Sequence, residues 1–399
     1  MEQEEFRYAR IGTTIYKVVN RPMVGGGSAK KLVAWRYGLI CQDEGKDYAA
    51  TIPKFDGFCN LPNHINYQRD IDGFYNLYEP ITHVPEAGPC PHILELVDHI
   101  FGEQRELGLD YLALLYLRPV QKLPVLILVS EERNTGKTTF LNFVKAMFQD
   151  NVTFNTNEDF RSQFNSDWAG KLVIAVDEVL LNRREDTERL KNLSTARTYK
   201  MEAKGKDRQE VEFFGKFILC SNNESCPVLI DPGETRFWVR KIAPLAKDDT
   251  GFLRKLKDEI PAFLDFLQKR QLSSREQSRL WFAPADLRTD ALDKIIAASR
   301  NRTEVDIAEM LMDIMITENV DHMSFCVADL IALMDHFKIK VDKSQIRRIL
   351  NDIWCLPHAS NALSYQTYEV NYMESTHFGL KCGIGRFYTI TRDNIKHLC

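Results

Sequence analysis

Four consecutive residues, Thr135-Gly136-Lys137-Thr138, have the types and the order that can grip a chain of phosphates. Gly136 lets the backbone come close, Lys137 supplies a positive charge to the β- and γ-phosphates, and Thr138 offers a hydroxyl to Mg²⁺. The usual pattern, G-x-x-x-x-G-K-[ST], asks for a glycine where this chain has Glu131. The residues expected to bind the nucleotide are Asn134, Thr135, Gly136, Lys137, Thr138 and Thr139.

A pair of acidic residues, Asp177 and Glu178, follows the apolar run of "LVIAVDEV". In open α/β sheets ligands bind at the carboxyl ends of strands, which is where such a pair is delivered. Asp177 can hold Mg²⁺ through water, and Glu178 can orient and deprotonate an attacking water. Together with the phosphate-binding loop, this pair indicates a nucleotide hydrolase.

Two more polar positions accompany apolar strands. "FILCSNN" ends with Asn222 and Asn223, and an amide at this place can sense the γ-phosphate and hold the water. In "GETRFWVRK", Arg236 is suited to reach the nucleotide of a neighbouring subunit, where an arginine neutralises charge in the transition state. Arg240 or Lys241 can share that work.

Positive charge gathers in one segment of a chain whose net charge is −4. "YKMEAKGKDRQEVEFF" alternates around a Lys-Gly-Lys turn, which predicts a β-hairpin with a basic tip. We expect Lys200, Lys204 and Lys206 to contact the phosphates of a nucleic-acid strand. The basic residues of this segment are Lys191, Arg197, Lys200, Lys204, Lys206 and Arg208, against the acidic Glu202 and Asp207.

A largely parallel sheet covered by helices would bring these motifs together. Short apolar runs alternate with helical patterns from residue 123 to about 245, which predicts an α/β core. The predicted strands are "LPVLILVS", "KLVIAVDEV", "GKFILCSNN" and "TRFWVRKIAPL". "GKTTFLNFVKAMF" is predicted to be a helix that begins at the phosphate-binding loop.

Five segments are expected along the 399 residues. These are a small β-rich or mixed region (1–85), a helical lead-in (86–122), the α/β core (123–248), a helical linker or lid (249–300) and a final segment (301–399). In the final segment three amphipathic runs precede strands in "SYQTYEVNYM" and "RFYTITR", which predicts a winged helix-turn-helix.

The motifs "ERNTGKTTF", "LVIAVDEV", "KMEAKGKDR", "FILCSNN" and "ETRFWVRK", in this order, resemble those of a superfamily 3 helicase. The nearest likeness is to the poxvirus- and phage-type primase-associated helicases, over about residues 90 to 245. The resemblance implies an AAA+-like P-loop ATPase core that binds ATP and Mg²⁺. It also implies a homo-hexameric ring that translocates on single-stranded DNA during phage or mobile-element replication.

The resemblance also gives each candidate residue a role. The Walker A motif is matched by Gly136, Lys137 and Thr138, and the Walker B motif by Asp177 and Glu178. The DNA-contacting hairpin is matched by Lys204 and Lys206, sensor 1 by Asn222 with Asn223 as second choice, and the arginine finger by Arg236. Glu131 departs from the family's glycine, which affects the first bend of the loop and not its grip on phosphate.

Many relatives carry a primase-polymerase domain upstream. Asp70 and Asp72 suggest a two-metal polymerase site, but the region before the helicase motifs is short for a polymerase domain, and "DIDGFYN" is typical of a turn. We therefore expect any primase or polymerase to be a separate partner.

The remaining features indicate a cytoplasmic protein, and the resemblance implies that the cell is bacterial or phage-infected. No apolar run is long enough to span a membrane, and the nine cysteines include no C-x-x-C pair. The spacing of Cys59, His64, His83, Cys90 and His92 fits no zinc pattern, which favours structural roles.

Two other functions remain open. One is a P-loop ATPase switch in a regulatory or defence complex, without DNA-stimulated hydrolysis. The other is a replication initiator that binds DNA without catalysis, against which the pair Asp177 and Glu178 argues.

Overall fold

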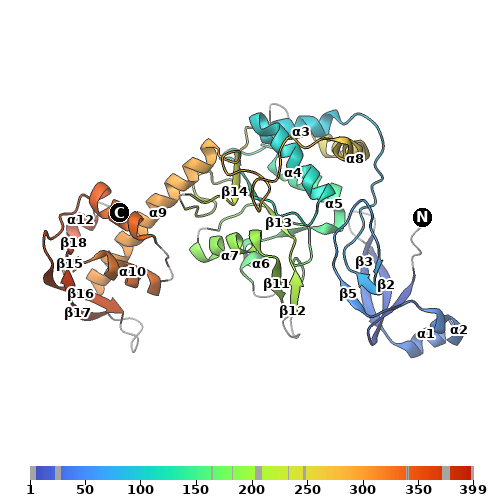
Figure 1. The fold of residues 1–399 in the computed structure, drawn as a ribbon, viewed down its shortest axis with the longest axis horizontal. Coiled ribbons are helices and arrows are strands. Elements are labelled where there is room, and N and C mark those ends of the chain that lie inside the picture. Colours follow the sequence, from blue (N-terminus) through green and yellow to red (C-terminus); the bar gives the residue numbers. More distant parts are fainter. Residues whose placement is uncertain are drawn as a thin grey trace. The chain divides into compact units, whose positions relative to one another are not determined.

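The computed structural model describes residues 6–22, 28–162, 165–181, 183–202, 209–231, 233–245, 249–337, 339, 341–370 and 378–396. The chain divides into two compact units (Figure 1). The first unit is Met1–Val179, Lys191–Asn222 and Thr235–Thr289, and the second is Leu180–Leu190, Asn223–Glu234 and Asp290–Cys399. Within the described residues, no helix combines the length and the apolar character that crossing a membrane requires.

A five-stranded, all-parallel sheet forms the centre of the first unit, as the alternation of strands and helices predicts. Because all strands run the same way, the carboxyl ends of the three central strands meet at one edge. The order across the sheet is β14 (Phe237–Lys241), β8 (Val125–Val129), β13 (Lys216–Ser221), β10 (Val173–Val176) and β9 (Val152–Asn155).

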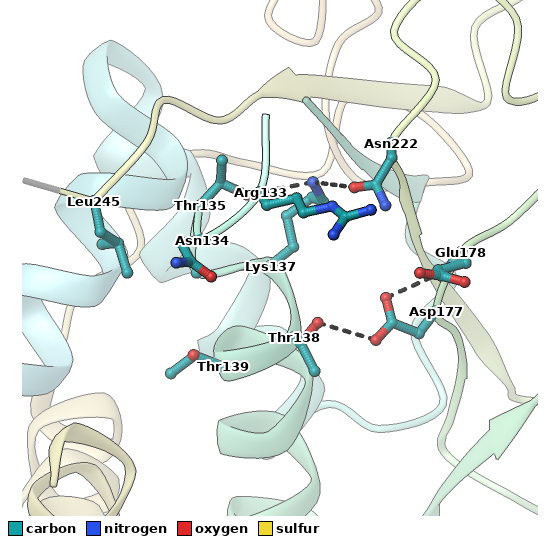
Figure 2. Close-up of a pocket in the computed structure, with 11 residues that line it drawn as sticks. Arg133, Asn134, Thr135, Lys137, Thr138, Thr139, Asp177, Glu178, Asn222 and Leu245 are labelled. Atoms are coloured by element: carbon teal, nitrogen blue, oxygen red, sulfur yellow. Dashed lines mark hydrogen bonds between the residues drawn. The ribbon is translucent and has the colours of Figure 1, made fainter. Parts of the chain in front are cut away.

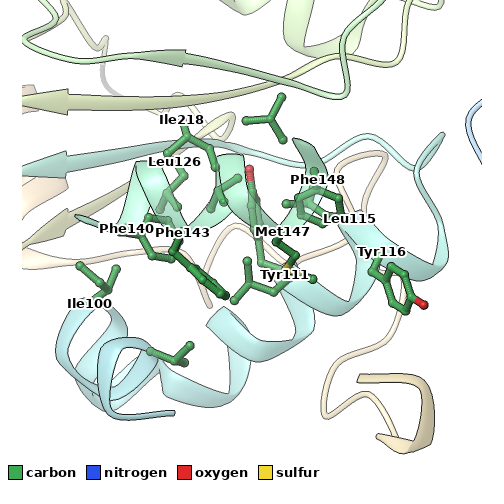
Figure 3. Packing of buried hydrophobic residues seen from close by; sticks show 14 of the residues in the cluster. Ile100, Tyr111, Leu115, Tyr116, Leu126, Phe140, Phe143, Met147, Phe148 and Ile218 are labelled. Atoms are coloured by element: carbon green, nitrogen blue, oxygen red, sulfur yellow. The ribbon is translucent and has the colours of Figure 1, made fainter. Parts of the chain in front are cut away.

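Four helices share a hydrophobic core with this sheet: α3 (Pro91–Phe101), α4 (Arg105–Leu117), α5 (Lys137–Phe148) and α8 (Phe252–Lys269). Figure 3 shows Phe140, Phe143 and Met147 of α5 in this core together with Tyr111 of α4. Gly108 allows the tightest approach, since a Cβ atom there would lie 2.3 Å from the ring of Phe101. This core fixes the start of α5, and with it the predicted phosphate-binding loop.

The predicted basic hairpin is present next to the core. Strands β11 (Thr198–Met201) and β12 (Gln209–Glu212) pair antiparallel. Its base is held by Trp168, whose ring stacks on Tyr199 at 5.7 Å. The predicted tip, with Lys204 and Lys206, lies outside the described residues.

The N-terminal part of the first unit is a mixture of small sheets and short helices, as predicted. One sheet has the order β3-β2-β1-β4 and another has the order β5-β7-β6. Asp72 and Gly73 have positive φ values and form the turn between β6 and β7, which confirms that "DIDGFYN" is a turn. The elements are β1 (Tyr8–Ile11), β2 (Thr14–Pro22), β3 (Ser28–Trp35), α1 (Tyr37–Asp43), α2 (Lys46–Thr51), β4 (Lys54–Phe55), β5 (Gly57–Cys59), β6 (Asp70–Ile71) and β7 (Phe74–Asn76).

The second unit has its own core, in which Leu311, Phe325, Leu330 and Ile346 are buried. The order of helices followed by a β-hairpin agrees with the predicted order, and its identity as a winged helix stays a prediction. Its elements are α9 (Asp290–Thr317), β15 (His322–Phe325), α10 (Val327–His336), α11 (Lys343–Arg348), a π-helical turn (Ile349–Ile353), β16 (Leu363–Val370), β17 (Phe378–Gly385), β18 (Tyr388–Thr391) and α12 (Arg392–Lys396).

Two details of this unit differ from the sequence predictions. The helical runs predicted on either side of Asn301 are one continuous helix, α9, because no glycine or proline interrupts the chain there. The partner of β16 in the hairpin is β17, whereas the strand in "RFYTITR" pairs with β15. Glycines at 379, 383 and 385 weaken the strand pattern of β17, which is why the sequence did not predict it.

Three further elements were also missed. They are β9 at the sheet edge, α6 (Asn157–Arg161) and α7 (Arg184–Thr195). The four residues of β9 and the five of α6 give too few periodic positions to be read from a single sequence. Helix α7 has 12 residues, but its mostly polar sequence offers few apolar positions to form a pattern.

Candidate nucleotide-binding site

The loop between β8 and α5 turns through two left-handed residues, Asn134 (φ 55°) and Gly136 (φ 82°). Glycine adopts this conformation at no steric cost, and asparagine tolerates it better than most residues. Other parts of the first unit hold the loop: Leu245 N–H donates to the Asn134 carbonyl at 3.0 Å, and His99 Nε2 lies 3.0 Å from the Thr135 carbonyl. The loop is therefore shaped by its own backbone and fixed from outside.

Lys137 begins α5 and is buried. Its ammonium group donates to Ser130 Oγ, to Asn222 Oδ1 at 3.0 Å and to Thr135 Oγ1 at 3.3 Å. Three neutral oxygens thus solvate this positive charge. Asn222 comes from the end of β13, so the lysine joins the carboxyl ends of two strands (Figure 2).

Asp177 and Glu178 follow β10 at the same edge of the sheet. Thr138 Oγ1 donates to Asp177 Oδ2 at 3.0 Å, and Glu178 N–H donates to the other oxygen of Asp177 at 3.2 Å. Glu178 has a left-handed backbone (φ 57°), and its carbonyl accepts from the Asn157 amide at 3.2 Å. Strained backbone of this kind concentrates at functional sites.

These groups surround one cavity of about 510 Å³ (Figure 2). Nine residues predicted from the sequence line it, and the cavity also includes Arg133 and Leu245. The predicted lining residues are Asn134, Thr135, Gly136, Lys137, Thr138, Thr139, Asp177, Glu178 and Asn222.

The hydroxyl of Thr138 and the carboxylate of Asp177 suit a magnesium ion. Mg²⁺ binds through one or two carboxylates and completes its shell with water and substrate phosphates. These two side chains line the cavity and supply hard oxygen atoms 3.0 Å apart. The Cys220 thiol is fully buried, and burial, together with the Asp177 carboxylate, raises its pKa far above the usual value. The cysteine therefore stays a neutral thiol and adds no charge to the site.

Glu131 does not disturb this arrangement. It is exposed, it is absent from the lining of the cavity, and it is not among the described residues with positive φ. Because its backbone is not left-handed, the position has no need of glycine.

Asn222 and Asn223 have different surroundings. The amide oxygen of Asn222 accepts from Lys137 inside the cavity. The amide oxygen of Asn223 accepts from the backbone N–H groups of Ser225 and Cys226 at 3.0 and 2.9 Å, which closes a local turn.

Arg236 lies at the opposite edge of the sheet. Its carbonyl accepts from Val125 N–H at the start of β8, whereas the cavity begins after Val129 at the end of that strand. Five residues of strand separate the two edges by about 16 Å. Arg236 therefore does not belong to the cavity of its own chain.

Arg240 is a structural residue, in contrast to the expectation that it shares the role of Arg236. Its side chain is 7% exposed and forms an ion pair with Glu103 at 2.6 Å and a hydrogen bond to Gln104 at 2.7 Å. Lys241 follows it at the exposed carboxyl end of β14. Among the predicted DNA-binding residues, Lys200 is exposed on β11, and Lys204 and Lys206 lie outside the described residues.

Sequence reasoning missed two residues that support the loop, Ser130 and His99. Ser130 directly follows β8, so its position beside the loop was a usable signal. His99 lies far away in the sequence, on α3, and only the tertiary structure brings it to Thr135. No group of three or more His, Cys, Asp or Glu within the described residues forms a metal site. His64, for which the sequence favoured a structural role over zinc binding, is hydrogen-bonded through both ring nitrogens. Its partners are the Tyr116 carbonyl at 2.8 Å and the Tyr78 hydroxyl at 2.7 Å.

Comparisons with known proteins agree with this architecture. A family of unknown function (DUF5906) matches residues 128–236. This range includes the loop between β8 and α5, the carboxyl ends of β10 and β13, and Arg236. The DNA primase-polymerase of Nitratiruptor phage NrS-1 is 22% identical over 273 residues, which cover 65% of this chain and 36% of that protein. The chain thus spans about a third of the length of this curated relative.

Solved structures of the C-terminal region of NrS-1 in its apo state match almost the whole chain. One has a TM-score of 0.59 at 14% identity and covers 96% of this chain and 95% of that one. An A-form structure has a TM-score of 0.57 at 16% identity, with the same coverage. The chain is therefore a distant homologue of a phage DNA primase-polymerase and has the fold of that protein's C-terminal region.

Proposed function

We propose that this protein is an ATP-dependent DNA helicase of the superfamily 3 type that acts in phage or mobile-element DNA replication. One observation carries the proposal. Lys137, the Thr138–Asp177 pair, Glu178 and Asn222 come from three parallel strands and meet around one cavity. A protein that only binds DNA has no need of this arrangement.

The cavity is suited to the phosphates of ATP. Backbone N–H groups at the start of α5 and the ammonium group of Lys137 attract negative charge at one wall. Thr138 and Asp177 are the residues that would hold Mg²⁺. The ion, when bound, neutralises charge on the β- and γ-phosphates.

The acidic and amide groups opposite the loop supply the chemistry. Glu178 is the group that accepts a proton from the attacking water, since Asp177 is engaged by Thr138. The amide of Asn222 lines the same cavity as Glu178, where it can position that water. Lys137 already contacts Asn222, so the nucleotide-binding loop and the end of β13 are coupled.

Arg236 enters the proposal through a second subunit. Because it lies at the opposite edge of the sheet, it can serve only the cavity of a neighbouring copy. An arginine supplied in trans raises rates of phosphoryl transfer by about 10³ to 10⁵. A ring of identical subunits, a hexamer by the family resemblance, would give every cavity such a neighbour.

DNA and a replication partner complete the proposal. The curated relative is a DNA primase-polymerase, and this chain corresponds to about a third of it. We propose that the β11–β12 hairpin contacts single-stranded DNA through Lys200, Lys204 and Lys206. We also propose a separate primase or polymerase as partner, in the cytoplasm of the host cell.

The proposal is tested by steady-state ATP hydrolysis with and without single-stranded DNA, alongside the mass of the protein in solution. It predicts Mg²⁺-dependent hydrolysis that single-stranded DNA stimulates and an assembly larger than a dimer. A monomer whose hydrolysis ignores DNA would instead support an ATPase switch in a regulatory or defence complex.

A further inference from the structure

The N-terminal sheet is strongly basic, although the whole chain is slightly acidic. Between Phe6 and Gln42 there are seven Lys or Arg residues and no Asp or Glu, in a chain with 52 basic and 56 acidic residues. This stretch forms β1, β2 and β3 and most of α1. Such a local excess of one sign is the footprint of a polyanionic partner.

The strand register places most of these charges on one face. Residues directly opposite each other on neighbouring strands share a face, as do alternate residues along a strand. Arg10 is opposite Lys54, Tyr8 is opposite Lys17, and Val19 is opposite Lys31. The basic face therefore consists of Arg10, Lys17, Arg21, Lys31 and Lys54.

The other face of the sheet is occupied. Ala9 and Ile11 of β1 and Phe55 of β4 are buried there against Tyr75 of β7. On the basic face, within the part of the chain that the structure describes, the end near Tyr8 is covered by Ile40 of α1 and Ala49 of α2. The cations beyond that cover reach solvent.

Four of the five basic-face side chains, those of Arg10, Arg21, Lys31 and Lys54, are exposed. The fifth, Lys17, is half-buried, with its ammonium group 4.4 Å from the ring centre of Trp35 and 5.5 Å from that of Tyr8. These contacts fix one positive charge in the middle of the face. Arg7 lies apart from this set and forms an ion pair with Glu44.

We infer that the basic face is a DNA-binding site that holds the phosphate backbone, separate from the predicted β11–β12 hairpin. Lys17 and Arg21 are about 13 Å apart along β2, and four strands extend the face by a similar distance across the sheet. This area accommodates several phosphates. The face makes no demand on base sequence, because point charges that contact phosphates carry no sequence information. The choice of DNA among polyanions rests on the proposed function.

The test uses the full chain with Arg10→Gln, Arg21→Gln and Lys31→Gln combined. Affinity for a single-stranded oligonucleotide is measured over a salt series, and a duplex of the same sequence is measured in parallel. The logarithm of the association constant falls linearly with the logarithm of the salt concentration. Loss of three phosphate contacts makes this slope less steep by about 2 for a single strand. Affinity at low salt is expected to fall about tenfold or more. If the single-stranded oligonucleotide loses more affinity than the duplex, the face binds single strands; if the duplex loses more, the face binds double-stranded DNA.

Two control variants separate the local face from net charge and from misfolding. Arg254→Gln, Lys257→Gln and Arg275→Gln remove the same charge from exposed positions on α8 and the segment after it, and should leave affinity and slope near the wild-type values. Arg10→Lys, Arg21→Lys and Lys31→Arg keep the charge and should bind like wild type.

The inference is overturned if the basic-face variant keeps the wild-type affinity and slope. It is also overturned if the control variant at Arg254, Lys257 and Arg275 loses as much affinity as the basic-face variant. Wild-type protein without affinity for either DNA would overturn it as well. Hydrolysis of ATP without DNA is measured in the same preparations and should be unchanged in the basic-face variant. Absence of hydrolysis in wild type with DNA binding intact would count against the proposed function and leave this inference standing.

Discussion

Thr138 Oγ1 donates a hydrogen bond to Asp177 Oδ2 at 3.0 Å, which links the first turn of α5 to the end of β10. The two residues follow strands that are not neighbours, since α5 comes after β8, Asp177 comes after β10, and β13 lies between these two strands. The bond places a hydroxyl and a carboxylate where a magnesium ion would need them. With Asp177 engaged by Thr138, the next residue, Glu178, is the carboxylate proposed to accept a proton from the attacking water.

Glu178→Gln should lower the rate of ATP hydrolysis by about 10² to 10³, since a general base contributes on that order. Binding of nucleotide should change little, because the proposed phosphate-binding loop and Asp177 remain. Fluorescent nucleotide titration and single-turnover hydrolysis check the two halves of this prediction. Hydrolysis at the wild-type rate would remove Glu178 from the proposed chemistry.

Arg236→Ala should abolish most hydrolysis, and mixing should restore part of it. A subunit with Arg236→Ala keeps its own cavity, and a Lys137→Ala neighbour still offers an intact Arg236. Equal mixtures of the two inactive variants are therefore expected to hydrolyse ATP measurably. Mixed assemblies as inactive as the separate variants would argue that Arg236 does not act in trans.

Arg240→Ala serves as the contrast, because this residue is buried in an ion pair with Glu103 and a hydrogen bond to Gln104. Its loss should lower the free energy of unfolding by about 1 to 3 kcal/mol, because the hydrogen bonds of a buried, charged guanidinium are removed. Denaturant unfolding measures this change. A variant of wild-type stability with lost hydrolysis would reverse the roles assigned to Arg236 and Arg240.

Glu131→Gly should leave hydrolysis within about twofold of wild type, because the backbone there does not need the left-handed region. Asn134→Val is the matched change at a left-handed position. A β-branched residue there should cost about 1 to 2 kcal/mol and disturb nucleotide affinity. If Glu131→Gly impaired hydrolysis and nucleotide affinity more than Asn134→Val, the left-handed bend of the loop would have been assigned to the wrong residue.

His64 should make the protein less stable in mild acid. Burial lowers its pKa to about 4; in the neutral ring Nδ1–H donates to the Tyr116 carbonyl, and Nε2 accepts from the Tyr78 hydroxyl. In the unfolded chain the ring binds a proton near pH 6.5, so stability is complete above that pH and declines as pH falls from about 6.5 to 4. The full effect is about 3 kcal/mol. Urea midpoints measured across this window test it.

The control for this prediction is His64→Gln. It should be less stable than wild type at neutral pH and should show a flatter pH dependence between pH 6.5 and 4. An unchanged slope in that window would assign the acid sensitivity to other groups.

The site was predictable where its signals are local in the sequence. Gly136 and Lys137 stand between an apolar run and a helical pattern, and Asp177 ends another apolar run, so order alone placed them at one sheet edge. Contacts between distant segments were not predictable. His99 reaches Thr135 from another helix, and β17 was hidden by its glycines.

Lys216 illustrates the limit further. A lysine at the start of an apolar strand is usually exposed, yet here it is fully buried and donates to the Pro119 carbonyl. Burial lowers its pKa well below the usual value, and the nearby Lys122 adds to this effect. No sequence pattern announces a partner almost a hundred residues away.

The most direct test of the central claim is unwinding of a forked DNA duplex by wild type and Lys137→Ala in the presence of ATP and Mg²⁺. Lys137 is buried against Ser130 and Asn222 in the cavity, so its loss should abolish both hydrolysis and unwinding, while single-stranded DNA binding without nucleotide remains. Lys137→Ala that hydrolyses ATP and separates the strands at the wild-type rate would contradict the account.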